Sequence, residues 1–272
     1  LFRPCSLDSP RLLLYTGHCY YYSYVGCDKW QTGCGHCPQR GEFPRSLWVD
    51  RSRRNYEDKR RAFTSIPRDR LTIVPVSDWI RDEVRKSFFR DYDFRVIHNG
   101  INTDVFDISD PSDVRLRYNL SDKRIIPGVA SIWSREKGLD DFVSLAGMLH
   151  DDEVVVLVGI KPDEQRLLPD NVIGIARTEN VSQLAQLYSA ADVFVNPTWQ
   201  DNYPTVNMEA ISCGTPVVTY RTGGSVEAVT DETGLVVEKG DVSSLLGAVR
   251  LAIMRGKFVL QPFVPGLCSC PF

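Results

Sequence analysis

The chain has 272 residues, of which 43 % are hydrophobic and 25 % charged, and its formal net charge at pH 7 is −3. This composition is typical of a globular protein with a hydrophobic core, and the slightly acidic balance excludes a broad basic surface for nucleic acid. No apolar run approaches the roughly 20 residues that span a bilayer, and the first residues lack the layout of a secretory signal. We therefore expect a cytoplasmic protein, in which the sequons at Asn119 and Asn180 are coincidental.

The segment 16–38 is rich in cysteine and shows neither a helical nor a strand period. Four cysteines fall within nineteen residues: Cys19, Cys27, Cys34 and Cys37. In a reduced compartment such clustering favours a metal over disulfides, and the close pair Cys34-x2-Cys37 is a familiar half-site for tetrahedral zinc. We predict one structural zinc without a catalytic role, with His18 and His36 as competing ligands. Free thiols or two disulfides are the alternatives.

Strands and helices alternate from about residue 71 onward. "LTIVPVS" at 71–77 predicts a buried strand, and "DWIRDEVRKSF" predicts a helix with Asp78 as its N-cap. "FRVIHNG" at 94–100 predicts a second strand that ends at Asn-Gly, and the polar stretch 101–113 predicts a linker. Because only two strands precede the linker, residues 1–108 are predicted to be a partial, truncated first domain.

The alternation restarts after the linker and continues to about residue 253. Strands are predicted at 124–132, 153–160, 171–176, 192–198, 216–220 and 234–238, and helices at 137–149, 182–191, 204–214 and 241–253. Near-continuous apolar strands between amphipathic helices indicate a parallel sheet covered on both faces. We therefore predict an α/β fold with a doubly wound, Rossmann-like second domain at 109–255, which binds its ligand at the carboxyl ends of the strands.

Both ends of the chain fit this pattern poorly. The tail 256–272 contains prolines and cysteines and has no helical period, so it is predicted to be aberrant. We expect residues 1–14 and 257–272 to derive from shifted reading frames or a truncated gene.

Two carboxylates, Asp201 and Glu209, flank the predicted start of a helix at Pro204. Proline suits the first helical position, so the backbone N–H groups from Thr205 and Val206 onward form an anion site. Glu209 lies about 7.5 Å along the helix axis, and Asp201 lies just before the helix. The order of acid, anion site and acid matches the donor sugar, diphosphate and ribose of a nucleotide sugar. A surface Glu and a loop Asp are an equal alternative from spacing alone.

Two cations follow the first strand of the same domain. Arg135 and Lys137 lie beside Gly138 in the loop from strand to helix, which also opens at the ligand edge. Cations there would neutralise a diphosphate and stabilise it as a leaving group. Solvated loop cations are the alternative, which loses weight because both loops are expected to converge on one crevice.

Several motifs occur together and in order: "VSDWIRDEVRKSFF", "RVIHNGINTDVF", "SREKGL", the D-x7-E pair with "GTPVV", "TGGSVEAV" and "TGLVV". Over residues 71–250 this series resembles the retaining nucleotide-sugar glycosyltransferases of family four. Within that family the chain is most similar to bacterial polysaccharide glycosyltransferases of the colanic-acid type, which share the "TGHC…GC…GC..CP" segment. The resemblance implies the GT-B fold of two facing Rossmann-like domains, of which the first is incomplete here.

The resemblance also implies roles for residues. Arg135 and Lys137 would bind the donor diphosphate, Glu209 the ribose, and Asp201 the donor sugar. Family members usually carry Glu where this chain has Asp201, and Gly-Phe-Gly where it has "NYP" at 202–204. Two glycines of "TGGSVEAV" should let the backbone approach the ligand closely. They are Gly223 and Gly224.

We therefore expect a retaining hexosyltransferase that moves a sugar from a nucleotide diphosphate sugar to a saccharide or lipid-linked saccharide in cell-surface polysaccharide biosynthesis. Asp201, Arg135 and Lys137 form its expected catalytic set, without a catalytic metal, through positioning and leaving-group stabilisation. The alternatives are a non-catalytic nucleotide-sugar-binding fragment and a sugar phosphorylase-like enzyme. The charged stretch 50–63 suits peripheral contact with the inner face of an anionic membrane, although its interspersed acids favour an ordinary solvated face.

Overall fold

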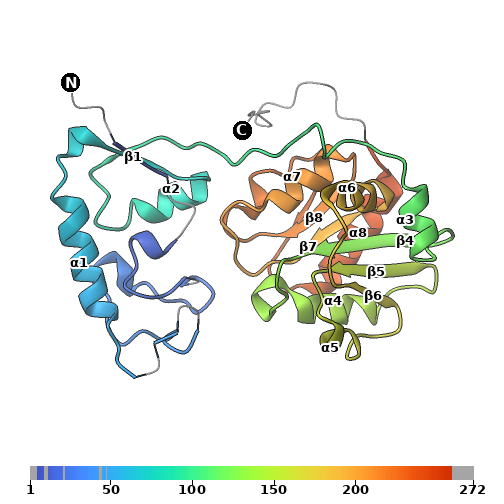
Figure 1. Ribbon diagram of the computed structural model, residues 1–272, viewed down its shortest axis with the longest axis horizontal. Coiled ribbons are helices and arrows are strands. Elements are labelled where there is room, and N and C mark those ends of the chain that lie inside the picture. The colour runs from blue at the N-terminus through green and yellow to red at the C-terminus, as the bar shows by residue number, and fades with distance from the viewer. Residues whose placement is uncertain (1–4, 9–11, 21, 43–44, 47, 259–272) are drawn as a thin grey trace. The chain divides into compact units, whose positions relative to one another are not determined.

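The computed structural model describes residues 5–8, 12–20, 22–42, 45–46 and 48–258 (Figure 1). The chain divides into two compact units, Leu1–Asn99 and Gly100–Phe272, where the sequence suggested a boundary at 108. Most of the predicted aberrant tail lies outside the described residues. None of the helices in the described ranges is both long and apolar enough to cross a membrane.

The first unit contains a parallel sheet in the order β1-β2-β3. These strands are β1 (Cys5–Asp8), β2 (Leu71–Val74) and β3 (Asp93–Phe94). The sequence predicted two strands before the linker. The third, β1, lies within residues 1–14, which were expected to derive from a shifted reading frame or a truncated gene. Strand β3 is shorter than predicted. Arg95 and Ile97 still donate backbone bonds to Ile73 and Pro75 at 3.0 Å, but Pro75 has no N–H to return one.

Two α-helices accompany this sheet: α1 (Ser52–Thr64) and α2 (Asp78–Val84). The predicted N-cap of α2, Asp78, is wrong by one residue. Ser77 is extended, with φ −152°, and its hydroxyl accepts a bond from the Ile80 N–H at 3.1 Å, so Ser77 is the cap. Three turns of 3-10 helix complete the described part of the unit: η1 (Leu12–Leu14), η2 (Lys29–Gln31) and η3 (Arg68–Arg70).

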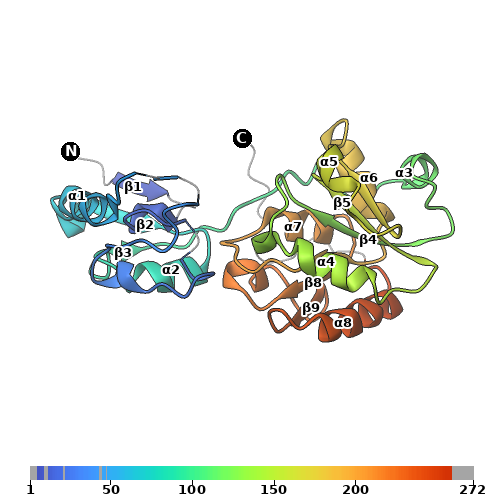
Figure 2. The same cartoon turned by 90° about the horizontal axis from the view of Figure 1, so that it is seen from below.

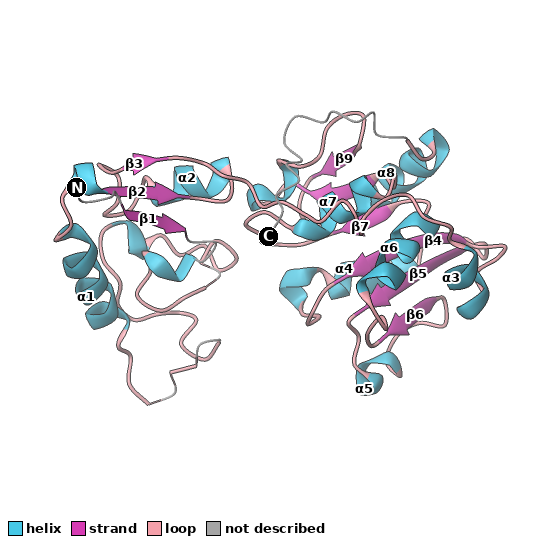
Figure 3. Ribbon diagram, turned by 45° about the horizontal axis from the view of Figure 1, so that its top comes forward, coloured by secondary structure: helices cyan, strands magenta, loops and turns pink. Residues whose placement is uncertain are grey.

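The second unit confirms the predicted series of six strands. They are β4 (Arg124–Val129), β5 (Glu153–Val158), β6 (Val172–Ile175), β7 (Phe194–Asn196), β8 (Val217–Tyr220) and β9 (Gly234–Val237). All pairings are parallel, in two three-stranded sheets, β4-β5-β6 and β7-β8-β9. The sheets adjoin where the Asp192 N–H bonds the Ile125 oxygen at 2.9 Å. The resulting order is β9, β8, β7, β4, β5, β6, a doubly wound arrangement, and Figure 3 shows β7 beside β4.

Helices cover both faces of these strands (Figure 2). They are α3 (Ser112–Arg117), α4 (Leu139–Ala146), α5 (Pro162–Gln165), α6 (Val181–Ala190), α7 (Thr205–Ser212) and α8 (Val242–Arg255). Phe142 of α4 and Val249 of α8 pack with Val155 in one buried cluster. Leu187 of α6 packs with Val154 in another, because alternate strand residues face opposite sides. Each fully buried side chain of this kind contributes about 1.5–3 kcal/mol.

Candidate functional site

A cavity of about 360 Å³ opens at the carboxyl ends of β4 and β7 in the second unit. These two strands begin the two halves of the sheet, so the cavity lies where the strand order reverses, the usual ligand position in such folds. Its polar lining comes from the end of β7, the loops that follow the two strands and the start of α7 (Thr205–Ser212). It includes Ser131, Lys137, Asn196, Asp201, Tyr203 and Thr205.

The loops after β4 and β7 meet at this cavity, as the sequence predicted. The Lys137 ammonium group donates to the Asp201 carboxylate at 2.6 Å, and their side chains are 31 % and 18 % exposed. Behind this pair the Glu136 carbonyl accepts bonds from the Trp199 N–H at 2.8 Å and the Thr198 hydroxyl at 3.2 Å. The two residues that were expected to contact different ends of one ligand therefore bind each other.

Gly138 allows this approach. Lys137 belongs to η4 (Arg135–Lys137), and Gly138 follows it with φ +76°, in the left-handed region. A Cβ atom at Gly138 would lie 2.3 Å from the Pro197 carbonyl oxygen. Glycine is therefore required both by its backbone conformation and by the close contact between the loops.

Gly223 and Gly224 lie against the backbone of Asp201. They begin η5 (Gly223–Val226). A Cβ atom at Gly223, whose φ is +50°, would lie 2.0 Å from the Asp201 carbonyl oxygen. The Gly224 N–H donates to that same oxygen at 3.1 Å. The close backbone approach predicted for this glycine pair thus occurs toward the loop that carries Asp201.

The first turn of α7 contributes Thr205 and Val206 to the cavity lining. Pro204 is the N-cap and not the first helical residue, because its ψ of 119° is extended. The backbone N–H groups of Thr205 and Val206 belong to the helix start and have no carbonyl four residues back within the helix. Such groups carry partial positive charge and suit a phosphate.

Glu209 lies on α7 but is not part of the cavity lining in the described chain. The buried Tyr188 of α6 donates its hydroxyl to the Glu209 carboxylate at 2.9 Å. Burial raises the pKa of Glu209, while hydrogen bonds from Tyr188 and Thr205 act in the opposite direction. Contact of Glu209 with a ribose therefore stays a prediction.

Arg135 is exposed and also lies outside the cavity lining. Its guanidinium group is 3.7 Å from the carboxylate of Asp140, and the two side chains are 73 % and 72 % exposed. An exposed pair of this kind contributes little to stability. Its predicted contact with the diphosphate would require the side chain to turn.

Buried polar residues beneath the cavity were missed by the sequence reasoning. The Asn196 amide donates to Asn207 at 2.8 Å, and Asn207 donates to the Ser225 carbonyl at 3.0 Å. These bonds fix the end of β7, the start of α7 and η5 relative to one another. The available signal was Asn196 itself, a polar residue at the end of an apolar strand. Tyr203 was also missed; burial is the main cause that raises its pKa to about 12.

The four predicted zinc ligands are brought together in the first unit. Cys19, Cys27, Cys34 and Cys37 are free thiols, and all four line one small cavity there.

Comparison with known proteins relates most of the second unit to a family of glycosyl transferases. Residues 123–254 match the model of the glycosyl transferases group 1. The D-inositol 3-phosphate glycosyltransferase of Mycobacteroides abscessus is 32 % identical over 155 residues, which cover 52 % of this chain and 35 % of that protein. We refer to residues 123–254 as the group 1 region.

Solved structures of similar fold extend the comparison beyond the group 1 region. The sucrose-phosphate synthase of Thermosynechococcus elongatus is 25 % identical, with a TM-score of 0.62, over 77 % of this chain and 54 % of its own. The complex of Anabaena Alr3699/HepE with UDP-glucose is 18 % identical, with a TM-score of 0.58, over 73 % of this chain and 58 % of its own. The α/β fold with parallel sheets therefore has glycosyltransferases of the GT-B type as neighbours, as the sequence predicted.

The chain spans 35 % of the length of the mycobacterial relative and just over half of each solved chain. The activities of those whole proteins therefore do not pass to this chain without a test.

Proposed function

We propose that the cavity of the group 1 region binds a nucleotide diphosphate sugar and that the chain transfers its sugar to an acceptor hydroxyl with retention. The observation that carries the proposal is the meeting of Lys137 with the first turn of α7 at one cavity, where Thr205 and Val206 present their N–H groups. A cation beside helix N–H groups suits a diphosphate. The similar fold of Alr3699/HepE, which was solved with UDP-glucose, agrees with this ligand class.

Binding of the donor would change the hydrogen-bond partners of Lys137 and Asp201. An arriving diphosphate competes with Asp201 for the Lys137 ammonium group, which is 2.6 Å from the carboxylate. The released carboxylate then accepts bonds from hydroxyls of the donor sugar. In this scheme Lys137 stabilises charge on the leaving diphosphate, and Asp201 holds the sugar.

Arg135 and Glu209 complete the proposed donor contacts. Arg135 is sufficiently exposed to turn from Asp140 toward the diphosphate. The Glu209 carboxylate, which is oriented by the Tyr188 hydroxyl, accepts hydrogen bonds from the ribose hydroxyls. Catalysis proceeds by positioning and electrostatic stabilisation, without a catalytic metal and with attack on the face that the diphosphate leaves.

The acceptor is proposed to be a saccharide or lipid-linked saccharide in cell-surface polysaccharide assembly. The support is the resemblance of segment 16–38 to the colanic-acid type. Contact between α1 and the inner face of a membrane has weaker support. Arg53 pairs with Glu57 at 3.0 Å, and Arg54 pairs with Asp58 at 3.6 Å, which reduces the positive charge that α1 offers to anionic lipid.

Calorimetric titration separates the candidate activities. UDP, GDP and ADP are titrated first, followed by the corresponding nucleotide sugars, and each bound donor is then incubated with water or saccharides and analysed by mass spectrometry. The proposal predicts that one diphosphate binds and that its sugar is released or transferred. Binding without turnover would support the non-catalytic alternative, and no binding of any diphosphate would overturn the donor site.

A further inference from the structure

A small cavity in the first unit is lined by all four clustered cysteines and by His18. Its volume is about 10 Å³, which leaves room for an ion or a single water and excludes an organic ligand. In the described chain the cysteines lie on the two sides of η2, two before it and two after it. They are Cys19, Cys27, and the close pair Cys34 and Cys37. No disulfide joins them in the described chain.

Cysteine binds a divalent cation as the thiolate, so each thiol that binds the ion releases its proton to solvent.

His18 gives independent support for a ligand in this cavity. Its side chain is buried, with 8 % of the residue exposed, and its Nε2 atom has no hydrogen-bond partner. A buried polar nitrogen without a partner is uncommon and destabilising. Because His18 lines the same cavity as the thiols, an ion held by their sulfurs would place charged acceptors close to Nε2.

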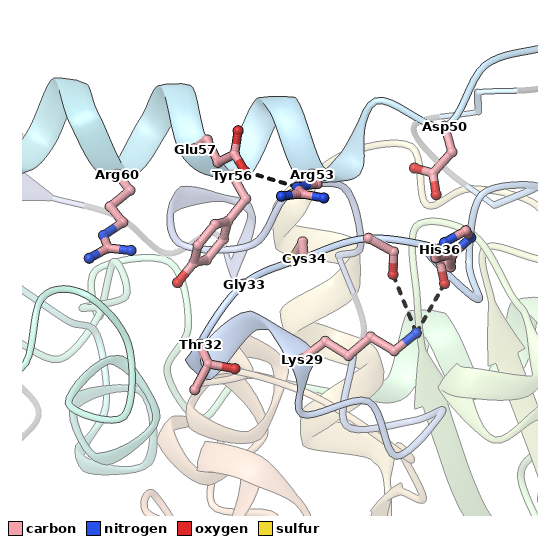
Figure 4. A pocket seen from close by; sticks show the side chains of 11 residues that line it. Lys29, Thr32, Gly33, Cys34, His36, Asp50, Arg53, Tyr56, Glu57 and Arg60 are labelled. Carbon is pink, nitrogen blue, oxygen red and sulfur yellow. Dashed lines mark hydrogen bonds and ion pairs between the residues drawn. The ribbon is translucent and has the colours of Figure 1, made fainter.

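The loops that carry the cysteines are held by hydrogen bonds at each position. The Thr16 hydroxyl donates to the Cys19 carbonyl, the Trp30 indole to the Cys27 carbonyl, the Gly17 N–H to the Cys34 sulfur, and the Cys37 N–H to Asp50. The Lys29 ammonium group donates to the carbonyls of Gly35 and His36, at 3.3 Å each, within the Cys34–Cys37 loop. Figure 4 shows Lys29 pointing toward His36. A Cβ atom at Gly17 would lie 2.7 Å from the Cys34 Cβ, so glycine is required there.

The sulfur atoms must move closer together to bind one ion. No three sulfurs of the described cluster lie within 4.8 Å of one another. Zinc–sulfur bonds of about 2.3 Å set tetrahedral sulfurs roughly 3.8 Å apart. Rotation of cysteine side chains on fixed loops can supply the difference.

We propose that Cys19, Cys27, Cys34 and Cys37 together bind one zinc ion as thiolates, and that the buried His18 ring donates to a bound sulfur. Four thiols release four protons as the four zinc–sulfur bonds form, and no oxidation or reduction is involved. All four zinc positions are occupied by protein, so the site is structural. It would order the segment 16–38, in which η2 is the one helical or strand element of the described residues.

The test measures metal in the full chain, purified without chelators from zinc-supplemented cells. Elemental analysis should give close to one zinc per chain. Cys34→Ser should lose most of this zinc. Cys213→Ser should keep it, because Cys213 is also a buried free thiol but lies in the second unit. Less than a tenth of a zinc per chain, or equal zinc in Cys34→Ser and wild type, would overturn the site.

Two further measurements keep the test decisive if Cys34→Ser does not fold. Exchange of wild-type zinc for cobalt(II) should give thiolate-to-metal absorption with the intensity of four thiolates and the visible bands of a tetrahedral ion. Octahedral bands would contradict the assignment. His18→Gln should retain the metal but lose it to a chelator several-fold faster than wild type; an unchanged rate would remove His18 from the site.

Discussion

The ammonium group of Lys137 is hydrogen-bonded to the carboxylate of Asp201 at 2.6 Å. Their loops follow different strands, β4 and β7, and Gly138 and Gly223 allow close contacts around both residues. Each charge is therefore matched before any ligand arrives. In the proposed function a phosphate that enters the cavity competes with Asp201 for the Lys137 ammonium group, and this competition determines what substitutions at either position should do.

Lys137→Met should weaken binding of the free nucleoside diphosphate and of the nucleotide sugar alike, because both carry the same two phosphates. The expected loss is about 1.5–3 kcal/mol, the scale of a hydrogen bond to a charged group. Calorimetry with both ligands measures it. Lys123→Met is the matched control, since Lys123 is exposed and lies at the amino end of β4. Equal losses in the two variants would indicate a general charge effect and contradict a site at Lys137.

Asp201→Asn should separate the two ligands. It frees Lys137 from its ion pair, so binding of the free diphosphate should stay equal or become tighter. Binding of the intact donor should weaken, because the amide is a poorer acceptor for sugar hydroxyls than the carboxylate. The ratio of the two dissociation constants is the measured quantity. If both ligands lose affinity by the same factor, Asp201 only supports the loop before α7.

Glu209→Gln should change the pH dependence of stability. Burial raises the pKa of Glu209 in the folded chain above its usual value of about 4.3. The contribution of Glu209 to stability is therefore fully present below that value and is lost as pH rises through the folded pKa. Glutamine has no charge to bury. The melting temperature of the variant, relative to that of wild type, should therefore rise as the pH increases from 4.5 to 7.5. A constant difference over this range would contradict a raised pKa.

The same variant should weaken nucleotide binding if Glu209 contacts the ribose. Tyr188→Phe is the informative companion, because it removes only the hydroxyl that donates to Glu209 at 2.9 Å. We expect both variants to lose affinity, with the larger loss in Glu209→Gln. Unchanged affinity in a folded Glu209→Gln protein would exclude Glu209 from the donor site.

Gly138→Ala should destabilise the second unit by about 1–3 kcal/mol, since it forces a left-handed backbone on alanine and a contact with Pro197. Gly247→Ala in α8 is the control. Its added Cβ meets nothing within 4 Å, and alanine in a helix interior is favoured by about 0.5–1 kcal/mol. Denaturant midpoints should therefore move in opposite directions. Midpoints that fall equally would mean that Gly138 has no special role.

The alternation of apolar strands and amphipathic helices was sufficient to predict the second unit. Val154 and Val155 illustrate why. Both are buried, on opposite faces of the sheet, so the sequence of β5 is apolar at successive positions. The residue types at a helix start did not by themselves identify the N-cap. Ser77 and Asp78 are both good caps, and only the backbone conformation at Ser77 separates them.

The sequence named two residues that the structure brings to one cavity, but it did not predict their contact. Lys137 and Asp201 were both named as candidates, yet their ion pair joins residues 64 positions apart, and a local pattern does not encode such a contact. Asn207 was missed for the same reason. It is a polar residue in a short helix, and its role depends on Asn196 and Ser225 in other segments.

The junction between β4 and β7 gives the sheet a seam. The described residues form ladders within β4-β5-β6 and within β7-β8-β9, whereas Asp192 and Ile125 join the halves through one backbone bond and one side-chain bond, at 2.9 and 2.8 Å. Amide hydrogens beside such a seam should exchange with solvent sooner than those in the ladders. The cavity opens across the seam, so a ligand that contacts both halves would brace them and slow that exchange at residues far from its own contacts.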